Sequence, residues 1–523
     1  ALPWQRHSVF APGVLQRLDL EPKDGRLRWA RQDLRAFDVQ AALAHAELFA
    51  DPRTRQYFGG PLTAINNALF DIGDRLFVTA DINRPWELDP ASMSLRTVVG
   101  AAREYGGGGT QLSLLSPFVP TAAHPFYDRR DGLLYTYSSR PSPRGGASLS
   151  QLQHELFVIT WDGVGEVKRW RVPGADLTQY VHDVRCTRNF VVLLESCSFR
   201  LEPGLLNLGL DKLRPDLPVT NLLVIRKSDL TEGNRGRGVP FHKITIPVES
   251  FHLSVDYADD GVELELWVTH GNGLDFLMMN DSRDVHWRTG RPFERAQLGQ
   301  YAYADYAPAG HYRVHVERQA LIQSQQIIDP ERYWGPSVWS WDTRIENVAD
   351  STLYLSWVGY DEALVSQRLM AMYGDRPHRI LPPGTLPRGS HAPALTAIDW
   401  RTGAVEQSYL YPAGAATISN QFIPRPGLGN GGWVGVYLVR PGRVVEYWLF
   451  DAERLASGPV ARLGCEGLRP VAVIHHHWTP EAPSRTATYH VAPGEDIDPD
   501  WRQLPAPYRR VIEDGLRFAE QGR

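Results

Sequence analysis

The sequence of 523 residues has little cysteine, little net charge and no long apolar run. Its three cysteines, Cys186, Cys197 and Cys465, are too few for a disulfide framework, and they favour a reducing, cytoplasmic location. No stretch of about 18 consecutive apolar residues occurs, so we expect no transmembrane helix. The 55 basic and 60 acidic residues leave a formal charge of −5, which gives no concentrated basic surface for nucleic acid.

Several common catalytic motifs are also missing. The chain contains no CxxC pair, no HExxH sequence, no Walker loop and no G-x-S-x-G elbow. These absences exclude the most familiar signatures of zinc proteases, phosphate-binding loops and serine nucleophiles. Any chemistry must therefore come from residues that are dispersed along the sequence.

Short alternating runs dominate the chain, which also contains 46 glycines, 39 prolines and 11% aromatic residues. Examples are RLFVTA (75–80), HELFVITWD (154–162), VELELWVTH (262–270) and VVEYWLFD (444–451). Such runs, bounded by turn residues, predict many strands and an all-β fold. A closed β-propeller formed by residues 1–523 as one domain fits best, because radial repetition protects strand edges. Two β-sandwiches in tandem are the alternative, although no proline- or serine-rich linker marks a boundary.

Residues 485–523 read as a C-terminal extension with a short helix over 506–521. Its apolar residues recur at helical spacing and would share one face. They are Tyr508, Val511, Ile512, Leu516 and Phe518. We expect this face to pack on the propeller rather than on a membrane or a partner.

Four of the 17 histidines stand at or just before predicted strands, separated by 58 to 223 residues. They are His124, His182, His252 and His475. No single helix or hairpin could gather residues so far apart. The inner strands of propeller blades converge on the central axis, so these four side chains could meet there.

The sequences around these histidines resemble the motifs of the carotenoid cleavage oxygenase family. TAAHPFYD (121–128) is similar to T-A-H-P-x-x-D with one extra alanine, and HDVRCTRNF (182–190) is similar to H-D-F-x-x-T-x-N-Y. FHLSVD (251–256) is similar to F-H-x-x-N-A, and IHHHWTP (474–480) is similar to F-H-G-[TS]-[FW]-x-P. A fifth segment, ISNQFIPRPG (418–427), is similar to S-E-P-x-F-V-P-R-P. Together the motifs keep the family's order from about residue 60 to residue 480.

This resemblance implies a seven-bladed propeller with loops and helices capping the metal-bearing face, and one Fe(II) bound by the four histidines. It implies a dioxygenase that uses O₂ to cleave a carbon–carbon double bond of an apolar, apocarotenoid-like alkene into two carbonyl products. The alternatives are a metal-dependent isomerase, an oxygenase of another unsaturated or aryl-alkene substrate, or a non-catalytic binding propeller. Imidazole also suits zinc and copper, so the ligands alone do not select iron.

The chain departs from the family at residues that would support the metal ligands. Alignment places Asp81, Ser419 and Ser324 where the family has three glutamates that hydrogen-bond the ligand histidines. His476 replaces the glycine after the last ligand, and His477 is a possible alternative ligand. Ala80 stands where stilbene-cleaving members resemble one another in having a lysine, which argues against a stilbene substrate.

The segment LLNLGL is a candidate patch for peripheral membrane contact at the mouth of a substrate tunnel, because basic residues follow it. Its apolar residues are Leu205, Leu206, Leu208 and Leu210. A buried loop or short helix is an equally open interpretation of this segment. The sequence gives no indication of the oligomeric state.

Overall fold

The computed structural model describes most of the chain. The described residues are 11–23, 26–51, 53–54, 58, 62–106, 115, 117–142, 153–200, 215–345, 347–427, 431–464 and 467–521. The predicted membrane-contact patch at 205–210 lies outside them.

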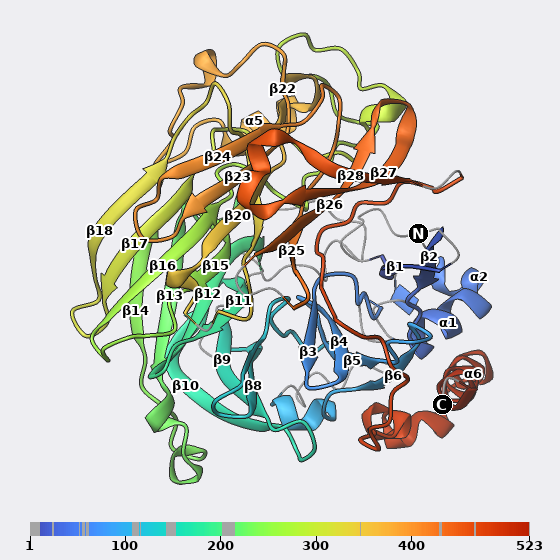
Figure 1. Cartoon of the computed structure of the whole chain (residues 1–523). Helices are drawn as coiled ribbons and strands as arrows, with labels where there is room; N and C mark the ends of the chain where they lie inside the picture. The colour runs from blue at the N-terminus through green and yellow to red at the C-terminus, as the bar shows by residue number, and fades with distance from the viewer. Residues whose placement is uncertain are drawn as a thin grey trace.

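Six four-stranded antiparallel sheets stand around a common centre (Figure 1). The first three are β3 (Leu69–Ile72), β4 (Arg75–Ala80), β5 (Asn83–Leu88) and β6 (Leu95–Val98); β7 (Phe126–Asp128), β8 (Leu133–Pro141), β9 (His154–Trp161) and β10 (Lys168–Leu177); and β11 (Gln179–Cys186), β12 (Phe190–Arg200), β13 (Val219–Arg226) and β14 (His242–Pro247).

The other three sheets continue the ring in chain order. They are β15 (Ser250–Val255), β16 (Glu263–His270), β17 (Ala309–His315) and β18 (Ala320–Ile327); β19 (Pro336–Ser340), β20 (Thr352–Trp357), β23 (Ala394–Asp399) and β24 (Val405–Leu410); and β25 (Asn420–Pro424), β26 (Gly432–Arg440), β27 (Val444–Asp451) and β28 (Pro459–Gly464). The first strand of each sheet contacts the inner strand of a neighbour, so β3, β7, β11, β15, β19 and β25 surround the axis. The all-β propeller is therefore confirmed.

The prediction of seven blades is wrong: the described residues form six. The gap between the last sheet and the first is filled by a two-stranded pair, β1 (Val14–Lys23) and β2 (Arg26–Asp33), and by residues 467–490, which run without strand pairing. We call residues 467–490 the closing segment. Its backbone NH at Val471 donates to the Tyr437 hydroxyl of the last sheet, and Arg485 pairs with Glu87 of the first. These contacts close the ring without a seventh four-stranded sheet among the described residues.

The core lies between neighbouring sheets, where the alternating strands place apolar side chains face to face. Leu222 and Leu194 of one sheet, for example, share a fully buried cluster with Leu253 and Leu266 of the next. This packing fixes the direction of the inner strands, and so the positions of side chains at the axis.

Helices are few in the described residues and lie outside the sheets. They are α1 (Phe37–Ala44), α2 (Ala46–Phe49), α5 (Gln367–Tyr373) and α6 (Ala506–Gln521). Val511 and Ile512 of α6 are fully buried in a cluster with Val39 and Ala41 of α1. Tyr508, Leu516 and Phe518 pack partly buried against the same cluster. None of the helices in the described ranges is long and apolar enough to cross a bilayer.

Long connections cover one side of the ring. Residues 271–308, which join β16 to β17, pack with the β20–β23 connection, which includes α5 and the short pair β21 (Tyr360–Asp361) and β22 (Ser390–His391). Their shared cluster is built on the buried rings of Tyr306, Trp334 and Tyr373.

Candidate metal centre

Three elements and one loop bring the four predicted histidines together. His182 lies on β11, His252 on β15 and His475 on the closing segment, while His124 lies two residues before β7. The His124 backbone is fixed to β11, because its NH donates to the His182 carbonyl at 3.1 Å and its carbonyl accepts from the Val184 NH at 2.9 Å. The two histidines, one before the second sheet and one in the third, are therefore joined by backbone hydrogen bonds.

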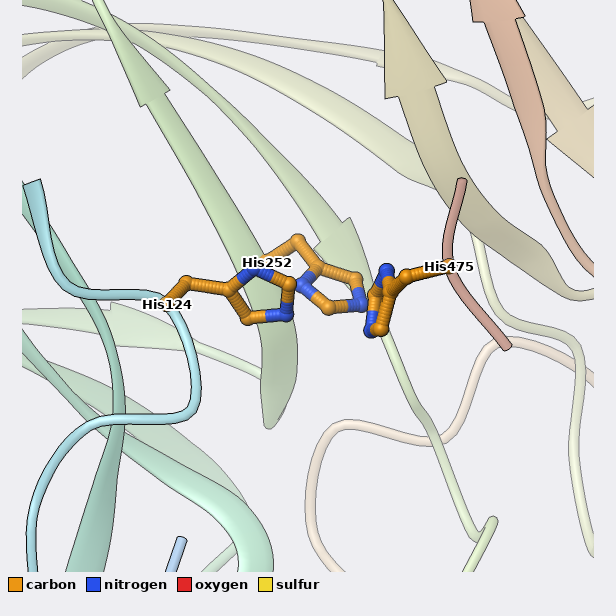
Figure 2. Close-up of side chains that lie close together, drawn as sticks. All are labelled: His124, His252 and His475. Atoms are coloured by element: carbon orange, nitrogen blue, oxygen red, sulfur yellow. The ribbon is translucent and has the colours of Figure 1, made fainter. Parts of the chain in front are cut away.

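The imidazole rings point toward one another. Figure 2 shows His124, His252 and His475, whose nearest ring nitrogens all lie within 4.8 Å of one another. The ring centroid of His124 lies 4.7 Å from that of His252 and 4.3 Å from that of His475. His182 adds a fourth ring, 5.1 Å from both His124 and His252.

Asp81, just after β4, holds the His182 ring. Its Oδ1 lies 2.7 Å from Nδ1 of His182, and both side chains are buried. This is the contact between carboxylate and histidine that the sequence alignment expected of Asp81. With Nδ1 donating to the carboxylate, Nε2 of His182 is left for another partner.

Burial sets the electrostatics of the four rings. Loss of solvent, reinforced by neighbouring histidines, lowers the pKa of His124, His252 and His475 well below the ordinary value. Burial acts on His182 in the same direction, but the Asp81 carboxylate outweighs it and raises the pKa of His182. Three rings are therefore neutral at pH 7, the form in which imidazole binds metal ions.

Asp183 is a site residue that the sequence analysis missed. It is fully buried, accepts from the Leu253 NH at 3.0 Å, and has its Oδ2 3.7 Å from Nδ1 of His252. Arg185 neutralises it at 2.6 Å. Burial raises the pKa of Asp183 to about 6, in spite of this arginine. Its position directly after His182 in the HDVRCTRNF motif was the available signal.

The two serines do not contact the predicted ligands. Ser419, just before β25, bonds Nδ1 of His476 at 2.6 Å, so it supports the neighbour of His475 rather than His475 itself. Ser324 is exposed on β18, the outermost strand of its sheet, and the structure does not bring it to the histidines. The inner strand that follows is β19, which begins at Pro336, so the alignment that matched Ser324 to a supporting glutamate selected a residue on an outer strand.

His477 points away from the other rings. Its Nε2 lies 3.1 Å from Oδ1 of Asp71 on the first sheet. Residues two apart on a regular extended strand share a face, so alternation alone does not separate His477 from His475. The pairing with Asp71 is what directs the His477 ring to the first sheet.

A cavity of about 1060 Å³ opens on the histidines. Asp81, His182, His252 and His475 contribute to its wall, and much of the rest is aromatic or aliphatic. Phe251 and Phe276 pack together beside His252, with ring centroids 5.0 Å apart. A volume of this size suits a large apolar ligand.

The donor set fits a metal ion. Nε2 of His124 is buried and has no hydrogen-bond partner among the described residues, although an unpaired buried nitrogen is costly. A cation held by this nitrogen and by the rings of His252 and His475 would satisfy it.

Comparisons with solved structures give the same fold. An apocarotenoid oxygenase variant from Synechocystis is 14% identical, with a TM-score of 0.59 over 91% of this chain and 88% of that one. A cobalt-substituted form of the Synechocystis protein has 15% identity and a TM-score of 0.57 over 90% and 88%. Lignostilbene dioxygenase from Pseudomonas brassicacearum has 15% identity and a TM-score of 0.56 over 90% and 93%.

Sequence comparison identifies the family. A search of curated protein sequences finds no match. The profile described as retinal pigment epithelial membrane protein matches residues 11–480, which include all four converging histidines. The chain therefore belongs to the family of the retinal pigment epithelial membrane protein, the carotenoid cleavage oxygenase family that its motifs resemble.

Proposed function

We propose that this chain is a non-haem Fe(II) dioxygenase that cleaves a carbon–carbon double bond of an apolar, apocarotenoid-like alkene into two carbonyl products. The observation that carries the proposal is the convergence of four histidine rings, three of which line the wall of a large, mostly apolar cavity. The similarity to solved structures of an apocarotenoid oxygenase and a lignostilbene dioxygenase supports the reaction class.

His124, His182, His252 and His475 would hold the iron through ring nitrogens. Bound iron would supply the redox chemistry that activates O₂. Asp81 accepts the Nδ1 proton of His182 and so fixes both the tautomer and the plane of that ring. Because three of the four rings stay neutral at pH 7, the site needs no proton release from them before a cation binds.

The cavity would position the double bond and exclude water. Phe251 and Phe276 contribute aromatic surface beside His252, and Ile82 and Leu274 extend the apolar wall. Such walls favour a hydrocarbon chain and give it few orientations. Ala80 also lines the cavity, so no ammonium group is present at that position to bind a phenol. An apocarotenoid-like substrate is therefore favoured over a stilbene.

A metal-dependent isomerase is the second candidate. Among the described residues, Asp81 is the one carboxylate that hydrogen-bonds any of these four histidines. Ser419, at another position where the family has a glutamate, contacts His476 instead. Fewer charged supports change the electron density at a metal and can alter the reaction that it performs.

Oxygen consumption distinguishes the two candidates. Protein loaded anaerobically with Fe(II) is mixed with a panel of apocarotenoids, and O₂ uptake is measured together with the incorporation of ¹⁸O into products. The dioxygenase proposal predicts one O₂ consumed for each double bond cleaved, with label in both carbonyl products. Geometric isomers formed without O₂ uptake would contradict it and support the isomerase.

A further inference from the structure

The cavity continues beyond the histidines into the gap left by the missing seventh blade. There it is bounded by Leu15, Leu18 and Trp29 of the β1–β2 pair, by the closing segment, and by one face of the β25–β28 sheet. Trp29 reaches across to Tyr437 of that sheet, with ring centroids 6.3 Å apart. A full seventh sheet in this gap would cover the face that the cavity now exposes.

Strand register shows which side chains share that face. Gln421 on β25 is paired with Gly435 on β26, and Tyr437, two residues on, is paired with Tyr447 on β27. Residues paired across neighbouring strands project from the same side of a sheet, as do residues two apart on one strand. Gln421, Tyr437 and Tyr447 all line the cavity.

His476 packs on this face beside Tyr447. The two ring centroids lie 5.8 Å apart, and both residues line the cavity. Ser419 occupies Nδ1 of His476, which leaves Nε2 as the free ring nitrogen. Neither this Nε2 nor the Tyr447 hydroxyl has a hydrogen-bond partner in the described part of the chain.

Gly435 makes room for the tyrosine. A Cβ atom at residue 435 would lie 2.1 Å from the Tyr447 hydroxyl oxygen, so any larger residue would displace it. Glycine inside a strand is unfavourable and often marks a close approach of another group. Here the glycine lies directly beneath the Tyr447 hydroxyl, which no other residue type would allow to stay in place.

We propose that His476 and Tyr447 form a polar subsite that binds a hydroxyl or carbonyl oxygen of an otherwise apolar substrate. The proposal rests on the proposed function, because the subsite belongs to the same cavity. A tyrosine hydroxyl can donate or accept, and the free imidazole nitrogen takes the complementary role, so a substrate hydroxyl can bond both. A pure hydrocarbon would leave both groups unpaired, which disfavours its binding.

Binding to the metal-free protein tests the subsite without turnover. The probes are diphenylhexatriene and its hydroxymethyl derivative, whose fluorescence rises in apolar surroundings. Wild-type protein, stripped of metal with a chelator, should bind the hydroxymethyl probe about tenfold more tightly than the hydrocarbon. His476→Phe and Tyr447→Phe should each abolish most of this preference, while binding of the hydrocarbon stays within about twofold.

Two further variants separate hydrogen bonding from cavity shape. His476→Gln retains a polar group at the same wall and should preserve part of the preference. Tyr301→Phe alters a cavity tyrosine that packs on Phe276, with ring centroids 5.2 Å apart, and should leave the preference intact. Circular dichroism establishes that every variant is folded before it is compared.

Three results would overturn the subsite: equal weakening of both probes in the two Phe variants, an unchanged preference in both, or failure of the folded wild-type protein to bind either probe. The proposed iron chemistry is tested separately by O₂ consumption. If the protein prefers the hydroxymethyl probe but consumes no O₂, the subsite is supported and the dioxygenase proposal is contradicted.

Discussion

Asp81 fixes His182 through a hydrogen bond of 2.7 Å, and this contact makes a residue-scale prediction. Asp81→Ala frees the Nδ1 proton and the orientation of the ring, so iron affinity should fall about 10- to 100-fold. Asp81→Asn preserves an acceptor without the charge and should lose less. Competition with a chromogenic chelator measures the affinity of each variant.

Asp71→Asn is the matched control. Asp71 lies 3.1 Å from Nε2 of His477, a histidine that points away from the other rings. If His477 is not a ligand, this substitution should leave iron affinity within about twofold. A loss as large as that of Asp81→Ala would assign a supporting role to His477 and contradict the four-histidine set proposed here.

Single residues also show where sequence reasoning succeeds and fails. The four histidines could be found because each stands in a recognisable local motif. The contacts of Asp183 and Ser419 could not, because they depend on how strands from different sheets pass one another. Ser419 is one strand away from the closing segment, and a shift of one residue decides whether it meets His475 or His476.

At the scale of elements, the closing segment carries His475 and depends on its attachment to the first sheet. The Arg485 guanidinium pairs with the fully buried carboxylate of Glu87 at 2.7 Å, and Arg75 pairs with the same carboxylate at 2.7 Å. Burial raises the pKa of Glu87, but the two arginines outweigh it and hold the pKa low. Glu87 thus stays charged and needs both partners.

Arg485→Ala should therefore lower the free energy of unfolding by about 3 kcal/mol, because it leaves a buried charge less compensated. It should also reduce iron retention, since the segment bearing His475 loses its attachment. Denaturant unfolding and metal content measured on the same preparation check both effects.

The control for this prediction is Arg103→Ala, which breaks a pair with Glu495 between side chains that are 62% and 38% exposed. An exposed pair contributes about 1 kcal/mol or less, so stability and iron retention should change little. Equal effects in the two variants would show that the closing segment is not held by Glu87.

Strand patterns located the elements well and their order within a sheet poorly. Alternation predicted β4, β9, β16 and β27 within a few residues. The same alternation occurs in inner and outer strands, so it did not distinguish β18, which carries the exposed Ser324, from the inner strand β19. The distinction arises from contacts between sheets, which a local pattern does not contain.

At the scale of the whole molecule, the fold buries histidines in their neutral form, so its stability falls when the pH is lowered. Burial lowers the pKa of His270 to about 4, and its two ring nitrogens contact the hydroxyls of Ser250 and Tyr312 at 2.9 and 2.7 Å. The unfolded chain takes up this proton near pH 6.5, before the folded chain does. The stabilisation is therefore complete above about pH 6.5 and is lost as pH falls toward 4.

His270→Gln should remove this contribution to acid sensitivity. For wild type, the His270 equilibrium lowers the free energy of unfolding by about 2 kcal/mol between pH 7 and pH 5. The variant should be less stable at pH 7, but should show a correspondingly smaller drop over that interval. Denaturant titrations at the two pH values measure both drops, and equal drops would contradict the assignment.

The number of blades is a property of the whole molecule that local sequence patterns did not predict. Closure depends on contacts such as that of Arg84 with Asp496 and that of Arg485 with Glu87, which join residues about 400 positions apart. The family resemblance implied seven blades, because local motifs do not show which strands pair where the ring closes.

The proposed dioxygenase requires a metal held by four histidines. We would measure the iron content of wild type beside His252→Ala and His475→Ala, with His154→Ala as a control at a buried histidine on β9 that contacts Ser139. We expect about one iron per chain in wild type and in His154→Ala, and almost none in His252→Ala and His475→Ala, with all four proteins folded. A wild-type protein that binds no iron after anaerobic loading, or ligand variants that retain it fully, would contradict the account.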